Sequence, residues 1–164
     1  MELKRGDIIM SYEKSITSWI VAKFTKSKYS HVGVYLGNNE YISAVPFKSV
    51  CITKTDTIKY FDVYRMKEIT KEQIDKVIEF CESKINAKYD FMQCILLFYR
   101  KVSGKLKKNN SDPNENKYEC SELIGEAFAS QGIKFCEHIE NTFPGTIADS
   151  DLTEFICSKG KIKG

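Results

Sequence analysis

Several features that would place a protein in a class at once are scarce or missing in this sequence. It has two histidines, no Cys-x-x-Cys spacing for zinc, no apolar stretch of signal-peptide length at its start, and no run near the roughly 18–20 apolar residues that cross a membrane. The net charge of +3 is small for 164 residues, unlike the basic footprint of a nucleic-acid binder. We therefore expect a cytoplasmic protein with no metal, no cofactor, no nucleic-acid partner and no stable membrane insertion.

Regular cysteine spacing is also missing, although the chain has six cysteines. A disulfide scaffold is typical of short secreted chains, whereas a chain of 164 residues buries a core without such bridges. Cys136 and His138 lie two positions apart, but no second pair of this kind accompanies them. We expect reduced thiols, most of which pack as small buried apolar side chains. They are Cys51, Cys81, Cys94, Cys120, Cys136 and Cys157.

Apolar patterning predicts strands in the first part of the chain and helices after it. The predicted strands are 6–11, 30–36, 41–44 and two further runs around Val50 and Val63. The predicted helices are 13–24, 91–102, 118–131 and one that follows the N-cap Thr70 and carries Ile74, Val77, Ile78 and Cys81 on one face. Strands followed by helices predict an α+β fold rather than a parallel α/β sheet.

Two later stretches lack such periodicity. Residues 103–117 are polar, with four lysines, four asparagines and a proline, which predicts a mobile surface loop. The chain from Phe143 onward predicts an irregular tail with room for a strand at 154–157. With no internal repeat, we expect one domain over residues 1–164.

His31 begins a predicted strand that ends in a Gly-Asn-Asn turn. We expect a three-residue turn over 38–40, because an odd number puts the apolar residues of both strands on one face. Ser43 then shares the opposite face with His31, and Gly33 leaves the strand bare beside the imidazole. On the residues alone, His31 is either a packed structural histidine or one half of a catalytic pair.

Cys120 is the candidate partner of His31. It lies in the first turn of the helix predicted over 118–131, where unpaired N–H groups and the helix dipole stabilise a thiolate. It also begins an apolar stripe with Leu123 and Ile124, which is the pattern of a core residue. The spacing allows both interpretations, so the two residues form a candidate nucleophile and base.

Three stretches resemble a known family. "GDIIMS" and "SHVGVYLGNNEYISA" resemble the strand pair of NlpC-type papain-like cysteine peptidases, and "YECSELIGEAF" resembles their nucleophile helix. Here the histidine strand precedes the cysteine helix, which is the order of the circularly permuted branch with YiiX-like bacterial proteins and lecithin:retinol acyltransferase-like enzymes. "FPGTIADSDL" resembles the YiiX-like tail, where a Pro-Gly step precedes a short helix. The resemblance implies a papain-like fold with a small antiparallel sheet packed against helices.

The resemblance also implies roles for individual residues. Cys120 matches the nucleophile and His31 the base, and "NAKYDFM" makes Tyr89 a candidate hydroxyl near the oxyanion, beside the Cys120 N–H. The third catalytic position, twelve residues after the histidine, holds Ser43 where the family usually has histidine, glutamate or another strongly polar residue. A serine accepts a hydrogen bond from the imidazole but brings no charge. The nearby carboxylate of Glu40 is expected to lie too far away.

The leading functional hypothesis is a cysteine hydrolase, a peptidase or amidase that cleaves a small peptide or peptide-like amide through a thioester. One alternative is a thiol acyltransferase or lipid hydrolase. Those relatives carry Asn-Cys-Glu-His where this chain has Glu-Cys-Ser-Glu, and the segment around Trp19 and Phe24 fits a core helix better than a membrane anchor. Another alternative, supported by Ser43, is a binding module that has lost turnover.

Overall fold

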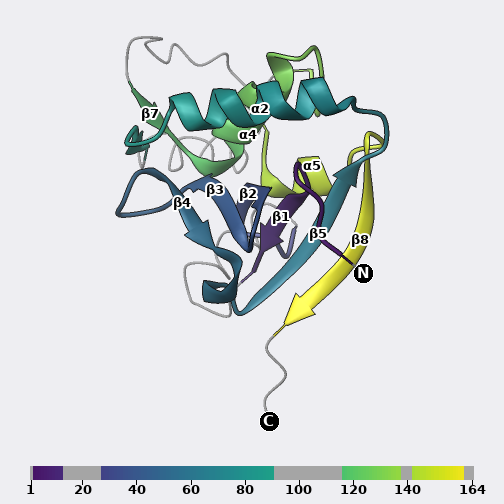
Figure 1. Cartoon of the computed structure of the whole chain (residues 1–164), viewed down its shortest axis with the longest axis horizontal. Helices are drawn as coiled ribbons and strands as arrows, with labels where there is room; N and C mark the ends of the chain where they lie inside the picture. The colour runs from purple at the N-terminus through teal and green to yellow at the C-terminus, as the bar shows by residue number, and fades with distance from the viewer. Residues whose placement is uncertain (1, 13–26, 91–115, 138–141, 161–164) are drawn as a thin grey trace, which may run out of the picture.

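The structure, a computed structural model, describes residues 2–12, 27–90, 116–137 and 142–160. Six strands form one antiparallel sheet in the order β4-β3-β2-β1-β5-β8 (Figure 1). They are β1 (Ile8–Ser11), β2 (His31–Gly37), β3 (Glu40–Ala44), β4 (Val50–Lys54), β5 (Tyr60–Met66) and β8 (Thr153–Gly160). Two short strands, β6 (Lys88–Tyr89) and β7 (Lys117–Tyr118), form a separate parallel pair.

Helices cover one side of this sheet. They are α2 (Lys71–Ser83), α4 (Cys120–Ala129) and α5 (Pro144–Ala148), and a 3-10 turn, η1 (Thr55–Thr57), links β4 to β5. Helices α2 and α4 contact each other, α4 also contacts β2 and β3, and α5 contacts β8. In Figure 1, α2 runs across the top of the molecule with α4 behind it. The arrangement confirms the predicted α+β class.

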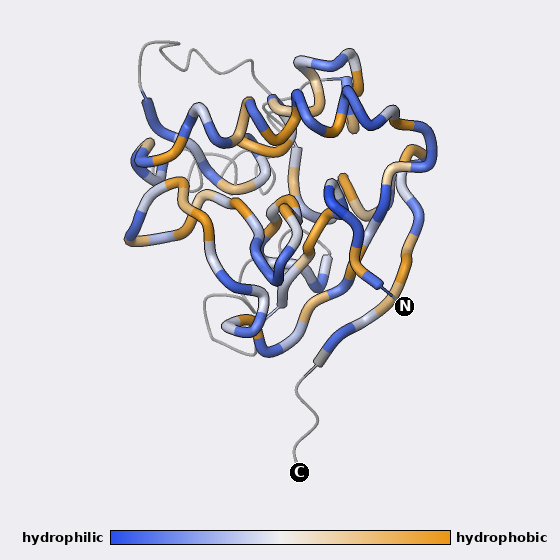
Figure 2. Tube along the Cα trace, viewed as in Figure 1, coloured by the Kyte–Doolittle hydropathy of each residue, from blue (hydrophilic) through white to orange (hydrophobic). Residues whose placement is uncertain are grey.

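The sheet has an apolar cluster on each face. The larger cluster joins the strands to the helices and includes Val32, Val34 and Ile42 from the sheet with Ile78 and Ile124 from α2 and α4. The smaller cluster holds side chains that alternate with these, among them aromatic residues of β2, β3 and β5. Figure 2 shows apolar residues along the central strands and alternating with hydrophilic ones along α2.

Helix α2 confirms the predicted start at Thr70. The Thr70 hydroxyl accepts from the Gln73 N–H, and the Gln73 side chain accepts from the Thr70 N–H, which completes a capping box. The predicted face is also present, with Val77, Ile78 and Cys81 buried. The cap and the apolar stripe together explain why this segment could be predicted from local sequence.

The β2–β3 hairpin has the predicted pairing but a different turn. Only Asn38 and Asn39 form the turn, both with positive φ (51° and 61°), as a two-residue hairpin turn requires. Glu40 is already paired with Gly37, so the prediction of a three-residue turn was wrong. A β-bulge between Tyr35 and Gly37 supplies the extra residue instead, and the apolar residues still share one face.

Other predicted boundaries need correction. The prediction of an irregular tail was wrong, because α5 forms there; the strand expected at 154–157 is confirmed as part of β8, which pairs with β5 at the edge of the main sheet. Lys117 belongs to β7 rather than to a loop, and Tyr118 ends β7 instead of starting a helix. The helices predicted over 13–24 and 91–102, and most of the loop predicted over 103–117, lie outside the described residues.

Five cysteines lie within the described ranges, and all five are free thiols, as predicted. Cys81 and Cys120 are buried, but Cys51, Cys136 and Cys157 are partly exposed, so the expectation that most are buried was wrong. The strands that carry Cys51 and Cys157 lie at the two edges of the sheet, where less of the surface is covered. Within the described part of the chain, no helix has the length and apolar composition needed to cross a bilayer.

Candidate active site

His31 and Ser43 meet across two neighbouring strands. The His31 Nε2 lies 3.0 Å from the Ser43 Oγ, which confirms the prediction that the two residues share a face of the sheet. Ser43 is fully buried, and His31 is partly buried at the start of β2. Because this bond uses Nε2, a second partner of the ring would meet Nδ1.

The protonation of His31 follows from its surroundings. Burial lowers the pKa of His31 to about 4, so the imidazole is neutral at pH 7. A neutral imidazole is a general base, provided that the accepting nitrogen carries no proton. His31 therefore accepts a proton at Nδ1 only when Nε2–H donates to the Ser43 Oγ. The Ser43 hydroxyl can accept from or donate to Nε2, so the bond is compatible with this tautomer and with the other one.

Gly33 allows the close approach of β3 to this pair. A Cβ at Gly33 would lie 2.7 Å from the Ile42 carbonyl oxygen, 2.7 Å from Tyr41 Cδ2 and 3.0 Å from the Ser43 Cβ. The prediction that a bare strand at Gly33 lets another element approach closely is therefore confirmed, and the approaching element is β3. Any side chain at Gly33 would push against the strand that holds Ser43.

Cys120 is the first residue of α4, within the predicted first turn although the helix begins two positions later than predicted. It is 4% exposed and belongs to the same apolar cluster as Leu123 and Ile124, so it has the position of a nucleophile and that of a core residue at once. Its Sγ lies 3.6 Å from the Glu119 Oε2, in the geometry of a thiol that donates to a carboxylate. The helix N-terminus favours a thiolate here, whereas an ionised Glu119 opposes it.

Glu119 and Glu122 were not predicted as part of the site. Glu119 is the N-cap of α4, and its carboxylate accepts from the Ser121 hydroxyl and the Glu122 N–H while Glu122 reaches back to the Glu119 N–H. Burial raises the pKa of Glu119, and burial together with Glu119 raises the pKa of Glu122 to about 8. The three-residue spacing of a capping box was the sequence feature that could have revealed the pair.

Helix α4 neighbours the two strands of the His31–Ser43 pair, but these two side chains alternate along the strands with Val32 and Ile42, which belong to the cluster on the helix side. Helix α4, which begins at Cys120, packs on β2 and β3, which carry His31 and Ser43. Between described residues, the hydrogen bonds join His31 to Ser43 and Cys120 to Glu119, and none of them joins the thiol directly to the imidazole. Catalytic hydrogen bonds are often long in free enzymes, so this geometry does not exclude a thiol–imidazole pair.

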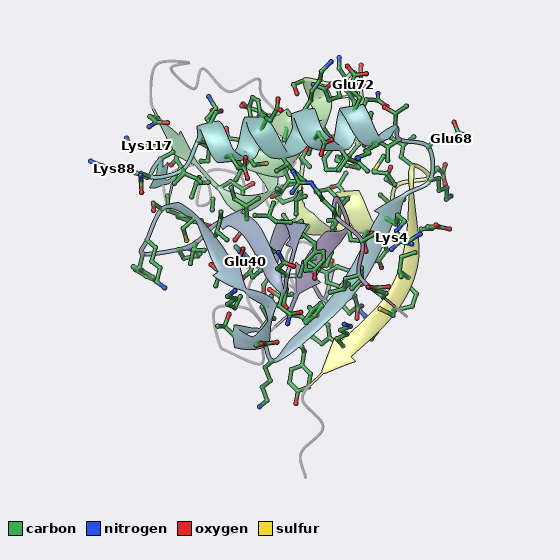
Figure 3. All side chains as sticks on the ribbon, viewed as in Figure 1. Lys4, Glu40, Glu68, Glu72, Lys88 and Lys117 are labelled. Atoms are coloured by element: carbon green, nitrogen blue, oxygen red, sulfur yellow. The ribbon has the colours of Figure 1, made fainter. Side chains whose placement is uncertain are left out.

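Tyr89 lies on the short strand pair that leads into α4. It is paired with Tyr118, two residues before Cys120, and the Asp90 N–H donates to the Tyr118 carbonyl oxygen at 3.0 Å. Figure 3 shows Lys88 and Lys117 side by side at the outer edge of this pair. The pair thus ties the segment of Tyr89 to the chain just before the thiol.

The remaining acidic candidate lies elsewhere. Glu40 is paired with Lys54 at 2.8 Å, and the two lie at the turn end of the hairpin, away from Ser43. Among the residues that the structure describes, no group of three or more His, Cys, Asp or Glu side chains is placed to hold a metal ion.

Comparison with known proteins identifies the family. The permuted papain-like amidases of the YaeF/YiiX, C92 family match residues 2–154. The chain belongs to this family. This C92 family chain is 25% identical over 156 residues to the "Probable lipoprotein peptidase YaeF" of Escherichia coli K12, an alignment that covers 80% of this chain and 57% of that protein. The chain thus spans little more than half the length of that curated relative.

A solved C92-like structure agrees with the fold. The structure of "metalloprotein yiiX" from Escherichia coli O157:H7 superposes with a TM-score of 0.72 and 15% identity, over 98% of this chain and 99% of that chain. Together with the family match, this agreement in fold confirms the predicted papain-like architecture. The predicted resemblance to the YiiX-like branch is likewise confirmed by the family match.

Proposed function

We propose that this chain is a cysteine amidase that cleaves a small peptide or peptide-like amide. Membership of a permuted papain-like amidase family makes a cysteine hydrolase the broad class. The observation that carries the finer proposal is the placement of Cys120 at the N-terminus of a helix that packs on the two strands of the His31–Ser43 pair. A nucleophile, a base and an orienting hydroxyl are thereby supplied by neighbouring elements.

The proposed reaction proceeds through a thioester. His31 takes the proton of the Cys120 thiol, and the thiolate attacks the amide carbonyl carbon. His31 then returns the proton to the leaving amine as the C–N bond breaks, and water hydrolyses the thioester by the reverse use of the same base. The backbone N–H of Cys120 is the candidate donor to the oxyanion, and Tyr89 is a second candidate.

Ser43 sets an upper limit on the proposed activity. Its hydroxyl orients the imidazole but leaves the imidazolium without a counter-charge, and loss of a carboxylate at this position in serine proteases costs about 10⁴ in kcat. We expect slow turnover. A binding module without turnover is the second candidate, and it is favoured by the bonding of the Cys120 thiol to Glu119 rather than to His31. The cytoplasmic location and the small amide partner remain predictions.

The alkylation rate of each thiol by iodoacetamide, followed by mass spectrometry over roughly pH 4 to 9, tests the proposal. We expect Cys120 to react far below the ordinary thiol pKa of about 8.5 and to lose this in the His31→Ala variant. Cys81 is an internal control, because burial raises its pKa to about 12. Equal rates at Cys120 with and without His31 would contradict an active pair and leave the binding module.

A further inference from the structure

A second site lies beside β5 and β8, apart from the residues of the proposed reaction. It is a pocket of about 310 Å³ whose lining comes from the segment before β2, from β5, from the end of α5 and from β8. The lining is mostly polar and contains one lysine, two aspartates, two tyrosines and two serines. None of these side chains takes part in the mechanism above.

Asp62 forms the floor of this pocket. Its carboxylate is fully buried, yet Lys28 Nζ lies 2.6 Å from Oδ2 and the Tyr29 hydroxyl donates to the same oxygen at 2.7 Å. The Ser158 hydroxyl donates to Oδ1 at 2.6 Å. Burial alone would raise the pKa of Asp62, but these hydrogen bonds outweigh it and the net shift is downward. The pocket therefore holds a buried, ionised carboxylate.

Aromatic rings complete the surroundings of the Lys28 ammonium. The Nζ lies 5.2 Å from the Tyr12 ring centroid and 5.1 Å from the Tyr29 ring centroid. These two rings meet edge to face at 6.2 Å. A carboxylate together with two ring faces is the arrangement by which proteins recognise ammonium groups. In this structure the ammonium that fills it belongs to the protein itself.

Lys28 enters this arrangement from the outside. Its side chain is 57% exposed, whereas that of Asp62 is 0% exposed, so only the tip of the lysine is held. The pocket volume lies beside this tip, and the exposed carboxylate of Asp149 lines the same pocket. A lysine with a solvated stem leaves such a position by rotation of its own side chain, without movement of the sheet.

We propose that this pocket binds a primary ammonium group of a ligand, which takes the place of Lys28 against Asp62, Tyr12 and Tyr29. The exchange replaces one cation by another, so the buried carboxylate keeps a counter-charge throughout. Lys28 then competes with the ligand and lowers its apparent affinity by the fraction of time that it fills the site. The site is complete within this chain, and binding needs neither the thiol nor the imidazole.

One extension rests on the proposed function. Tyr29 is two residues before His31, and it belongs to the same apolar cluster as Cys120. For an amidase with this site, the favoured substrates are amides that also carry an ammonium group. A Cys120→Ala variant separates the ammonium pocket from the proposed amidase activity, because the substitution removes turnover but leaves the pocket intact. Ligand binding to this variant therefore tests the pocket alone.

The test compares three small ligands by thermal unfolding of the wild type and of Lys28→Met. Nα-acetyl-lysinamide carries only a side-chain ammonium, norleucinamide carries only an α-ammonium, and Nα-acetyl-norleucinamide carries none. We expect an ammonium ligand to raise the melting temperature of both proteins, with an apparent Kd about tenfold lower for Lys28→Met. The neutral ligand should raise neither. The ligand that binds tells whether a side chain or a peptide N-terminus is the source.

Lys59→Met is the matched control, because Lys59 lies over the Tyr60 ring at 5.3 Å and lines no part of the pocket. It should leave ligand binding at the wild-type value. Binding to Lys28→Met alone, an equal effect of the neutral ligand, or no binding would each overturn the proposal. If Lys28→Met does not fold, amide chemical shifts of Tyr29, Asp62 and Ser158 in the titrated wild type decide, and unshifted amides overturn it.

Discussion

Asp62 and Glu119 are both buried carboxyl groups, but their surroundings shift their pKa values in opposite directions. Asp62 has a lysine ammonium and two hydroxyl donors, and its pKa is lowered despite burial. Among the residues that the structure describes, Glu119 has a hydroxyl, a thiol and a backbone N–H as donors but no cation, and its pKa is raised by burial. Neutral donors alone do not offset the loss of water around a carboxylate, whereas one ammonium in contact does.

The largest effect on stability is expected at Asp62, the buried carboxylate that is paired with an ammonium group. Asp62→Asn leaves Lys28, Tyr29 and Ser158 facing a neutral amide, and we expect the free energy of unfolding to fall by about 3 kcal/mol. Urea unfolding measures this change. The exposed Asp149 lines the same pocket, and Asp149→Asn should change stability by no more than about 0.5 kcal/mol. Similar losses in both variants would contradict the central role of Asp62.

The raised carboxyl pKa values at the start of α4 predict that the free energy of unfolding decreases as pH rises, which is opposite to the effect expected from Asp62. Between about 4.5 and about 8, unfolded chains have released the Glu122 proton that the folded chain still holds, so stability falls as pH rises. Relative to Glu122→Gln, the wild type should lose about 1 kcal/mol for each pH unit within this window. Asp62 does the reverse, because its contribution is present above its unfolded pKa and is lost as pH falls through the folded pKa.

Urea titrations at several pH values measure that difference. Glu68→Gln, an exposed change at the end of the segment before α2 (Figure 3), is the control and should follow the wild type at every pH. A difference between wild type and Glu122→Gln that stays constant with pH would show that the Glu122 proton is not retained in the folded protein.

A smaller effect is expected on the thiol itself. An ionised Glu119 would oppose a thiolate beside it by like-charge repulsion, so Glu119→Gln should speed iodoacetamide alkylation of Cys120 at pH 8 by up to about tenfold. Ser121→Ala removes another donor to the same carboxylate without a change of charge, and it serves as the control. Slower alkylation in Glu119→Gln would mean that the carboxylate activates the thiol instead of opposing it.

Ser43 extends the comparison to a buried polar group without charge. Ser43→Ala removes one hydrogen bond to the imidazole, and one such bond contributes about 1 kcal/mol. We therefore expect the rate of Cys120 alkylation, or of amide hydrolysis, to fall by less than about tenfold. The effect is small because no charge is lost. A decrease of several powers of ten would instead assign Ser43 the weight of a catalytic carboxylate.

Local sequence explains the parts of the fold that could be predicted. The alternation in β2 and β3 placed Ser43 beside His31, and the Thr70 cap with its apolar stripe defined α2. The helix start at Cys120 was also predicted to the first turn. In each case the decisive interactions lie within a few residues or across one hairpin.

Non-local contacts explain what was missed. A strand was expected at 154–157, but its full length over 153–160 and its place beside β5 depend on the edge that β5 offers, which no local pattern reveals. The bulge near Leu36 likewise depends on the partner strand. Lys28 and Asp62 carry no sequence feature that joins them, since 34 positions separate them and only the register of the sheet brings them into contact.

The pairing of β5 with β8 also has a consequence for synthesis on the ribosome. Met66 pairs with Thr153, which is translated 87 residues later, so at about 5–20 residues per second the outer edge of β5 waits roughly 4 to 17 s for its partner. Until then the nascent chain presents unpaired N–H and C=O groups beside the ionised Asp62. Completion of this domain during translation is therefore governed by its last strand rather than by the helix that carries Cys120.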